Sequence, residues 1–179
     1  EIKVDTIEKY VEEKKEISGW DKVKAFYVSH SSKPTYVEVA RTFNLEVARL
    51  YNYILQEEKE INYGIIHALD GYDEISLTSG FKLFTRNDEQ IINPEDLGQK
   101  RLQQSDIFGG NSVAEAANIF KTILNGKGSE AQNNVVLTNA AFALTIVDEN
   151  KSYETAFEEA KESLFGQKAK ETLQKLVSL

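Results

Sequence analysis

Apolar residues recur at helical spacing near the start of the chain and again over its last third. Near the start, this pattern predicts helices over 4–16, 21–30, 35–42 and 45–58. In the last third it predicts helices over 112–125, 129–147, 152–164 and 167–178. The chain is therefore expected to begin and to end in helical segments.

The middle of the chain has the pattern of short strands. An apolar run over 63–69 predicts a buried strand, and residues 75–79 alternate between apolar and polar. The runs 81–84 and 89–92 predict a hairpin, and a helical turn is predicted at 93–96. Together these elements predict an α/β fold. We expect a partial, mainly parallel sheet flanked by helices and preceded by a small all-helical segment.

Composition narrows the class of protein. With 41% hydrophobic residues and two prolines among 179 residues, the chain is expected to fold as one globular domain, with at most a small addition. We expect neither a membrane span, since no apolar run approaches ~20 residues, nor a signal peptide. The absence of cysteine excludes disulfides and thiolate metal sites, and a cytoplasmic location is expected.

Charge is distributed unevenly along the chain. The formal net charge is −8, yet residues 1–44 carry eight acidic and eight basic side chains, so the whole excess lies in residues 45–179. Such an acidic body argues against general nucleic-acid binding, which depends on basic side chains at phosphates. The sequence begins at Glu1 and contains no methionine, which leaves open a trimmed chain, a fragment or a sequence with residues missing.

The clearest candidate for chemistry is an adjacent acidic pair, Asp73 and Glu74. The pair follows the predicted buried strand and the small segment Asp70-Gly71. Open α/β sheets bind ligands beyond the carboxyl ends of their strands, and Mg²⁺ prefers carboxylate oxygens. The sequence therefore indicates a magnesium site here, although an acidic pair is more often part of a solvated loop.

Five short motifs stand in order along the second part of the chain. They are Leu45–Leu50, Ile65–His67 with Asp70–Ser76, Pro94–Gly98, Gly109–Asn111 and Val136–Ala141. Together they resemble the C-terminal portion of bacterial anthranilate phosphoribosyltransferase. Residues 65–67, followed by residues 70–76, are similar to its strand and metal motif, usually His-Gly-x-Asp-Gly-Leu-Asp-Glu. Residues 94–98 are similar to its Thr-Pro-Glu-Asp-Phe-Gly. The resemblance covers about residues 45–179, and the combination of motifs is specific where each one alone is not.

The resemblance implies a transferase that acts in tryptophan biosynthesis. Members of that family move phosphoribose from phosphoribosyl pyrophosphate to the amino group of anthranilate. They combine a large α/β domain, which has a mainly parallel sheet, with a small helical domain. By resemblance, Asp73 and Glu74 bind one of the Mg²⁺ ions that hold the pyrophosphate. His67 lies next to this motif, and we expect it to be a structural residue of the core.

Parts of the family's site have no counterpart in this sequence. The family's Gly-Thr-Gly-Gly-Asp loop is absent, and no Gly-rich loop precedes residue 60. The backbone N–H groups of such loops carry phosphate contacts. The Ser/Lys/Arg segment and the anthranilate pocket also find no match. We therefore expect the chain alone to be inactive, with no catalytic residue assigned.

Loss of the front of a parallel sheet would expose the edge of the remaining strands. We therefore expect this edge to cause self-association or to be covered by residues 1–44.

Residues 1–44 do not resemble the transferase. The segment Val37–Leu45 weakly resembles the first helix and turn of a helix-turn-helix, with Asn44 where the turn needs a left-handed residue. In this alternative, Arg49 and Asn52 contact DNA, and the C-terminal body senses a ligand or has no ligand. A fragment of a helical bundle, without DNA binding, is the simpler interpretation.

The two resemblances predict two domains, 1–44 and 45–179. Their boundary near Phe43-Asn44 is expected to be a join between sequences of different origin, as in a chimera, or a natural rearrangement. A gap in the sequence is the third interpretation. Each of these explains why the helix after the boundary fits both patterns.

Asn139 interrupts the apolar pattern of the predicted helix over 129–147. A polar side chain in such a position needs a hydrogen-bond partner. We expect it to bond a neighbouring loop as a structural residue rather than to contact a ligand.

Overall fold

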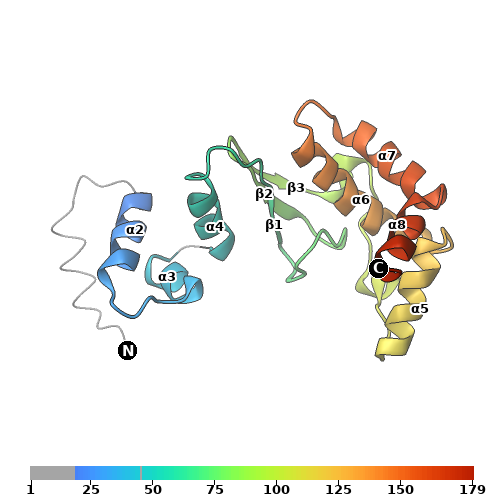
Figure 1. Ribbon diagram of the computed structural model, residues 1–179, viewed down its shortest axis with the longest axis horizontal. Helices are drawn as coiled ribbons and strands as arrows, with labels where there is room; N and C mark the ends of the chain where they lie inside the picture. Colours follow the sequence, from blue (N-terminus) through green and yellow to red (C-terminus); the bar gives the residue numbers. More distant parts are fainter. Residues whose placement is uncertain (1–18, 45) are drawn as a thin grey trace. The chain divides into compact units, whose positions relative to one another are not determined.

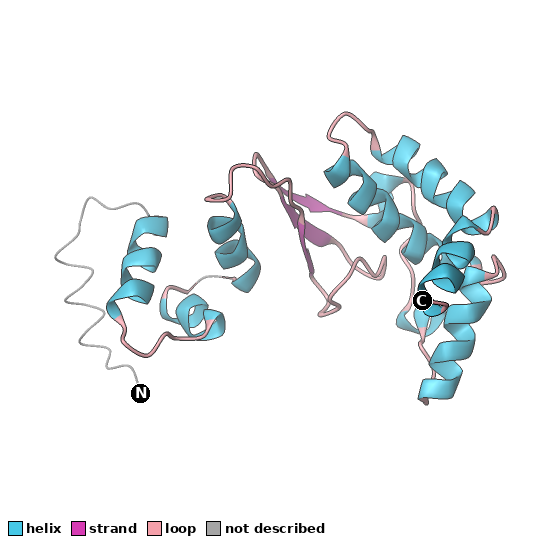
Figure 2. Cartoon of the chain, in the orientation of Figure 1, coloured by secondary structure: helices cyan, strands magenta, loops and turns pink. Residues whose placement is uncertain are grey.

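The computed structural model describes residues 19–44 and 46–179 (Figures 1 and 2). The chain divides between Glu60 and Ile61 into two compact units. The predicted helix over 4–16 lies outside the described residues. The mixed α/β class is confirmed, with a helical segment before the sheet. The described helices of the first unit are α2 (Gly19–Ser29), α3 (Tyr36–Thr42) and α4 (Val47–Leu55).

In the first unit, the described helices α2, α3 and α4 share one apolar core. Five buried side chains form this core: Val23, Phe26, Val39, Ala40 and Leu50. Val23 and Phe26 lie three positions apart and share one face of α2, and α3 and α4 add buried side chains to the same core. The partly buried rings of Trp20 and Tyr27, also on α2, pack against this cluster.

Local capping fixes the start of α3. The Thr35 hydroxyl accepts a hydrogen bond from the Glu38 N–H, and the Glu38 carboxylate accepts one from the Thr35 N–H at 2.7 Å. This reciprocal arrangement satisfies backbone donors that the first helical turn leaves free. The bonds from Thr35 hold the pKa of the Glu38 carboxyl below its usual value.

A left-handed residue joins α3 to α4. Asn44 has a φ of 50°, which confirms the conformation predicted for it. Asparagine adopts this region more readily than other non-glycine residues. The predicted boundary between residues 44 and 45 therefore lies inside the first unit, and the separate origin of residues 1–44 stays a prediction.

The second unit contains a three-stranded sheet. Its strands are β1 (Ile65–Ala68), β2 (Phe81–Phe84) and β3 (Glu89–Ile92), in the order β1-β2-β3. Both pairings are antiparallel, with Ile65 opposite Phe84 and Phe81 opposite Ile92. The predicted hairpin is thus confirmed, but the expected parallel direction is wrong. Parallel neighbours need a crossover, usually a helix, and the connection 69–80 contains no helix.

Helices follow the sheet to the end of the chain (Figure 2). Two short 3₁₀ turns come first, η1 (Pro94–Leu97) and η2 (Gln104–Ile107). The α-helices are α5 (Val113–Leu124), α6 (Glu130–Val147), α7 (Tyr153–Phe165) and α8 (Lys168–Val177). All four were predicted to within a residue or two, because serine side chains and turn residues mark their ends. Residues 75–79, which alternate in sequence, form no strand.

Helix α6 packs on the sheet and joins it to α7. Phe142 of α6 meets Phe81 of β2 edge to face, with ring centroids 5.3 Å apart. On its other side Phe142 contacts Tyr153 of α7, also at 5.3 Å. Burial raises the pKa of the Tyr153 phenol, whose oxygen lies 3.3 Å from the Thr138 hydroxyl. Core packing therefore extends from the sheet through α6 to α7.

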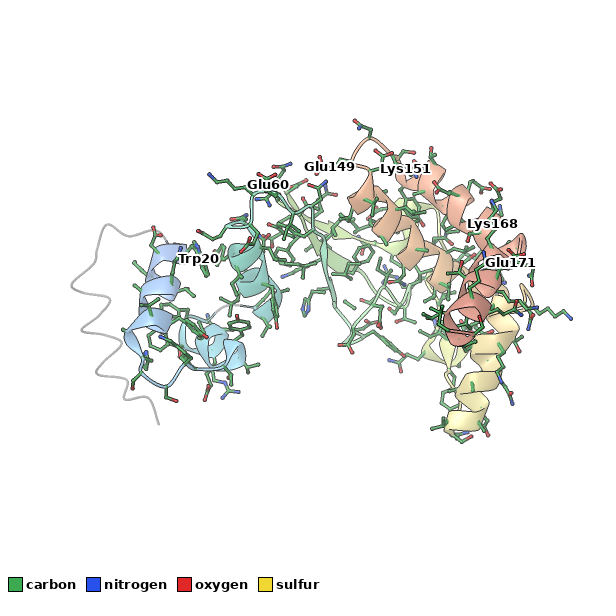
Figure 3. All side chains as sticks on the ribbon, in the orientation of Figure 1. Trp20, Glu60, Glu149, Lys151, Lys168 and Glu171 are labelled. Atoms are coloured by element: carbon green, nitrogen blue, oxygen red, sulfur yellow. The ribbon has the colours of Figure 1, made fainter. Side chains whose placement is uncertain are left out.

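The surface of the second unit carries many charges. Glu149 and Lys151 lie in the turn between α6 and α7, and Lys168 at the start of α8 lies 2.7 Å from Glu162 (Figure 3). Such exposed pairs contribute little to stability. Among the described helices, none has the length and apolar character needed to cross a membrane.

Candidate functional site

The candidate metal residues lie in the connection 69–80 between β1 and β2. Asp73 and Glu74 are both exposed at the surface of this connection, which we call the acidic loop. Because β1 and β2 are antiparallel, the pair does not lie at the carboxyl edge of a parallel sheet, as the sequence had indicated. The loop nevertheless brings two adjacent carboxylates to solvent, where they can meet a ligand.

The inner side of the acidic loop is held by its own polar side chains. Asp70 Oδ2 accepts hydrogen bonds from the hydroxyl of Ser76, at 3.1 Å, and from the hydroxyl of Thr78. The two hydroxyl oxygens lie 2.9 Å apart, and the Thr78 N–H donates to Ser76 Oγ at 3.1 Å. Residues before and after the acidic pair are therefore tied together.

A second attachment comes from helix α6. The Asn139 amide group accepts a hydrogen bond from the Ile75 N–H at 3.0 Å and donates one to the Ile75 carbonyl at 2.8 Å. It also donates to the Val135 carbonyl within its own helix, at 2.9 Å. The predicted structural role of Asn139 is confirmed. The loop it bonds is the one that carries the acidic pair, immediately after Glu74.

Residues just beyond the pair enter the core. Ile75 and Leu77 are almost completely buried, and both belong to the cluster around Phe81 and Phe142. Leu77 has a φ of 60°, a left-handed conformation that costs a non-glycine residue roughly 1–2 kcal/mol. Its carbonyl accepts a hydrogen bond from the Leu102 N–H at 2.9 Å. The end of the acidic loop that follows Glu74 is therefore anchored by buried side chains and by a backbone hydrogen bond.

The carboxylates of the acidic loop meet only part of what a Mg²⁺ site needs. No group of three or more His, Asp or Glu side chains that could enclose a metal ion occurs in the described part of the chain. Two exposed carboxylates do suit Mg²⁺, which keeps several waters and is commonly held by one or two carboxylates together with substrate phosphates. The assignment of Asp73 and Glu74 as metal ligands remains a prediction.

His67 is not the core residue that we expected. In β1 its side chain is exposed, whereas that of the next residue, Ala68, is buried. Successive side chains of a strand point to opposite faces, so only one of these two neighbours can face the core. The short side chain of Ala68 takes the inner position.

The residues of the alternative DNA interface are poorly placed for base contacts. Asn52 is only 8% exposed, and Arg49 is half-buried. Neither residue is without an interaction partner. Their role in DNA binding is a prediction that the burial of Asn52 does not favour.

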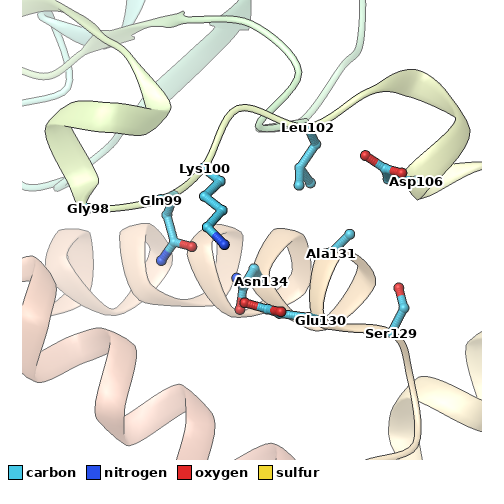
Figure 4. A pocket seen from close by; sticks show the side chains of 9 residues that line it. All are labelled: Gly98, Gln99, Lys100, Leu102, Asp106, Ser129, Glu130, Ala131 and Asn134. Carbon is cyan, nitrogen blue, oxygen red and sulfur yellow. The ribbon is translucent and has the colours of Figure 1, made fainter.

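A polar cavity that sequence reasoning missed lies elsewhere in the second unit. It has a volume of about 460 Å³ and lies between the segment 98–106 and the start of α6 (Figure 4). Its lining includes Lys100, whose side chain extends toward α6, and the carboxylates of Asp106 and Glu130. Neither Asp73 nor Glu74 lines it. The cavity joins residues distant in sequence, so no local motif could have indicated it.

Comparison with known protein families matches residues 30–170 to the family described as "Glycosyl transferase family, a/b domain". The matched range begins at residue 30 and includes residues 30–44, so the prediction that residues 1–44 do not resemble the family is wrong for that part. Among curated proteins, the chain is 51% identical over 142 residues to anthranilate phosphoribosyltransferase of Flavobacterium psychrophilum, covering 79% of this chain and 42% of that protein. The protein of the same name from Flavobacterium johnsoniae is 49% identical over 142 residues, with the same coverage.

A more distant relative gives the same result. Anthranilate phosphoribosyltransferase of Bacteroides fragilis is 45% identical over 146 residues, covering 82% of this chain and 44% of the relative. This chain therefore spans less than half the length of the curated proteins it matches.

Proposed function

The chain belongs to the glycosyl transferase family, and we propose that it acts as part of an anthranilate phosphoribosyltransferase, or as a shortened relative of one. The resemblance predicted from the five motifs is confirmed. The observation that carries the proposal is the similarity to these relatives across most of the second unit, including the acidic loop. On this proposal, the substrates of the complete enzyme are phosphoribosyl pyrophosphate and anthranilate.

Within such an enzyme, the acidic loop would hold the metal. Asp73 and Glu74 offer two exposed carboxylates to one Mg²⁺ ion. When bound, the ion would neutralise negative charge on the pyrophosphate group. Asn139 contributes by fixing the backbone of Ile75 directly behind the pair. The role of these residues is therefore to bind and orient the pyrophosphate end of the substrate.

The metal role predicts a defined loss of binding. Titration of the chain with Mn²⁺, followed by electron paramagnetic resonance of the free ion, is expected to show a weak site. Asp73→Asn together with Glu74→Gln should lower the affinity of this site by about tenfold or more, because both changes remove anionic oxygen ligands.

The chain contains a matched control for this experiment. Asp148 and Glu149 form another Asp-Glu pair, exposed in the turn after α6. Asp148→Asn with Glu149→Gln alters the net charge equally but should leave Mn²⁺ affinity unchanged. Equal losses in the two double variants would show only general charge attraction and would contradict the proposal.

We expect the 179-residue chain by itself to transfer no phosphoribose to anthranilate. No Gly-rich loop precedes residue 60, so the backbone donors that usually cradle phosphates are missing from this sequence. The assay follows the loss of anthranilate fluorescence in the presence of phosphoribosyl pyrophosphate and Mg²⁺. Turnover above the buffer control that disappears on Asp73→Asn would contradict this expectation.

DNA binding by the first unit is the second candidate. The left-handed turn at Asn44 between α3 and α4 is the observation that favours it. Binding with a steep salt dependence, weakened by Arg49→Ala, would support this candidate. Ligand sensing by the C-terminal body would require in addition that a metabolite change that DNA affinity.

A further inference from the structure

Three polar side chains of the acidic loop form hydrogen bonds with one another across the base of the loop. Asp70 stands before the acidic pair, and Ser76 and Thr78 stand after it. The Asp70 carboxylate accepts from both hydroxyls through the same oxygen, Oδ2. Ser76 is only 5% exposed, and Asp70 and Thr78 are partly buried, so this contact is partly shielded from solvent.

The Asp70 carboxylate depends on these two hydroxyls. Its other oxygen, Oδ1, is shielded from solvent and has no hydrogen-bond partner among the described residues. A shielded carboxylate oxygen without donors is unfavourable, so the two hydroxyl bonds to Oδ2 are the interactions that offset the desolvation. Loss of the Thr78 hydroxyl would leave the carboxylate with a single donor.

The backbone is bent to make this contact. Leu77, between Ser76 and Thr78, adopts its left-handed conformation while its side chain is 1% exposed in the core. Backbone strain of this kind persists only where surrounding contacts enforce it, and it often occurs at functional sites. Here the contacts are the buried Leu77 side chain and the hydrogen bonds that converge on Ser76 and Asp70.

The acidic pair itself has no such attachment. Within the part of the chain that the structure describes, neither Asp73 nor Glu74 makes a hydrogen bond or ion pair. Gly71, with a φ of 88°, has no atom within 4 Å of the position that a Cβ would take, so a side chain there would meet no packing partner. The positions of the two carboxylates are therefore set by the residues on either side of them.

We propose that Asp70, Ser76 and Thr78 act as positioning residues, which close the base of the acidic loop and present Asp73 and Glu74 as a preformed pair. This inference rests on the proposed function of the pair. Asn139 fixes only the end of the loop at Ile75, whereas the Asp70 contact ties its beginning to its end. A preformed pair binds a cation with less loss of conformational freedom than a mobile one.

Two variants of Thr78 separate the hydroxyl from the shape of the side chain. Thr78→Val keeps the branched shape and removes the donor, and Thr78→Ser keeps the donor. Amide hydrogen exchange of residues 71–76 is expected to be roughly tenfold faster in Thr78→Val, and close to wild type in Thr78→Ser. Amides of α6 should exchange at the wild-type rate in both variants, which shows that the fold persists. If α6 also exchanges faster in Thr78→Val, Ser76→Ala replaces it with the same expected result.

A Mn²⁺ titration of the same variants gives a functional readout. We expect Thr78→Val to bind Mn²⁺ about tenfold more weakly and Thr78→Ser to bind it as the wild type does, since groups that orient metal ligands have effects of about this size. If wild-type chain binds no Mn²⁺, the proposed function fails, and the exchange measurement alone decides the positioning role. Unchanged exchange of residues 71–76 in both Thr78→Val and Ser76→Ala would overturn the inference, whatever the metal affinity.

Discussion

Replacing Phe81 with alanine is expected to lower the free energy of unfolding of the second unit by about 3–5 kcal/mol. Phe81 is 1% exposed in β2 and contacts Phe142 of α6 edge to face. The substitution would therefore remove buried apolar area and an aromatic pair, and would leave a cavity between the sheet and α6. Urea unfolding followed by far-ultraviolet circular dichroism measures the loss.

Phe120 offers a matched control for this prediction. It lies on α5 and is 53% exposed, so Phe120→Ala makes the same chemical change outside the core. We expect a change of less than about 1 kcal/mol for this variant, as for most surface substitutions. Similar losses for Phe81→Ala and Phe120→Ala would show that the sheet and α6 do not share the core described here.

Asn139→Ala is expected to destabilise the second unit by about 2–4 kcal/mol. The substitution removes the hydrogen-bond partner of both the N–H and the carbonyl of Ile75, a buried residue of the core. It should also weaken Mn²⁺ binding, since the segment directly after Glu74 loses its attachment to α6. Urea unfolding gives the first effect, and Mn²⁺ titration of the folded variant gives the second.

The control for Asn139→Ala lies on the same helix. Asn134 is partly exposed at the edge of the polar cavity, and Asn134→Ala removes an identical amide group. Stability within about 1 kcal/mol of wild type and unchanged Mn²⁺ binding are expected. A small effect of Asn139→Ala on both measurements would mean that α6 does not hold the acidic loop.

Much of the helical structure could be predicted from the sequence because it is encoded locally. The start of α6 illustrates this. Ser129 accepts a hydrogen bond from the Gln132 N–H, and the Gln132 side chain accepts one from the Ser129 N–H. Such reciprocal caps depend on residues three positions apart. The left-handed turn at Asn44 was predictable for the same reason, since the conformation follows from the residue type.

The direction of the strands could not be obtained in this way. An apolar run such as 63–69 shows that a strand is buried, but it does not show which neighbour pairs with it or in which direction. The resemblance implied parallel strands, whereas β1 and β2 of this unit pair in antiparallel fashion. The exposure of His67 was missed for a related reason, because the strand's inner face depends on what packs against it.

The sequence predicted the exposed acidic pair of the candidate site, but not the contacts that hold the loop. The motif identified Asp73 and Glu74, and the need to satisfy a buried amide indicated that Asn139 bonds a loop. The sequence did not indicate which loop, since Asn139 and Ile75 are 64 positions apart. The hydrogen bonds of Asp70 with Ser76 and Thr78 could not be predicted either, because they depend on the left-handed conformation of Leu77. Leucine gives no local signal for that conformation.

The central claim is that the acidic loop binds the metal-bound pyrophosphate end of a substrate. The most direct test is isothermal titration of the chain with inorganic pyrophosphate, with and without Mg²⁺, for the wild type and for Asp73→Asn with Glu74→Gln. We predict binding that requires Mg²⁺ and is lost in the double variant, while Asp148→Asn with Glu149→Gln behaves as wild type. Absence of binding to the wild type, or binding that is indifferent to Mg²⁺ and to the acidic pair, would contradict the account.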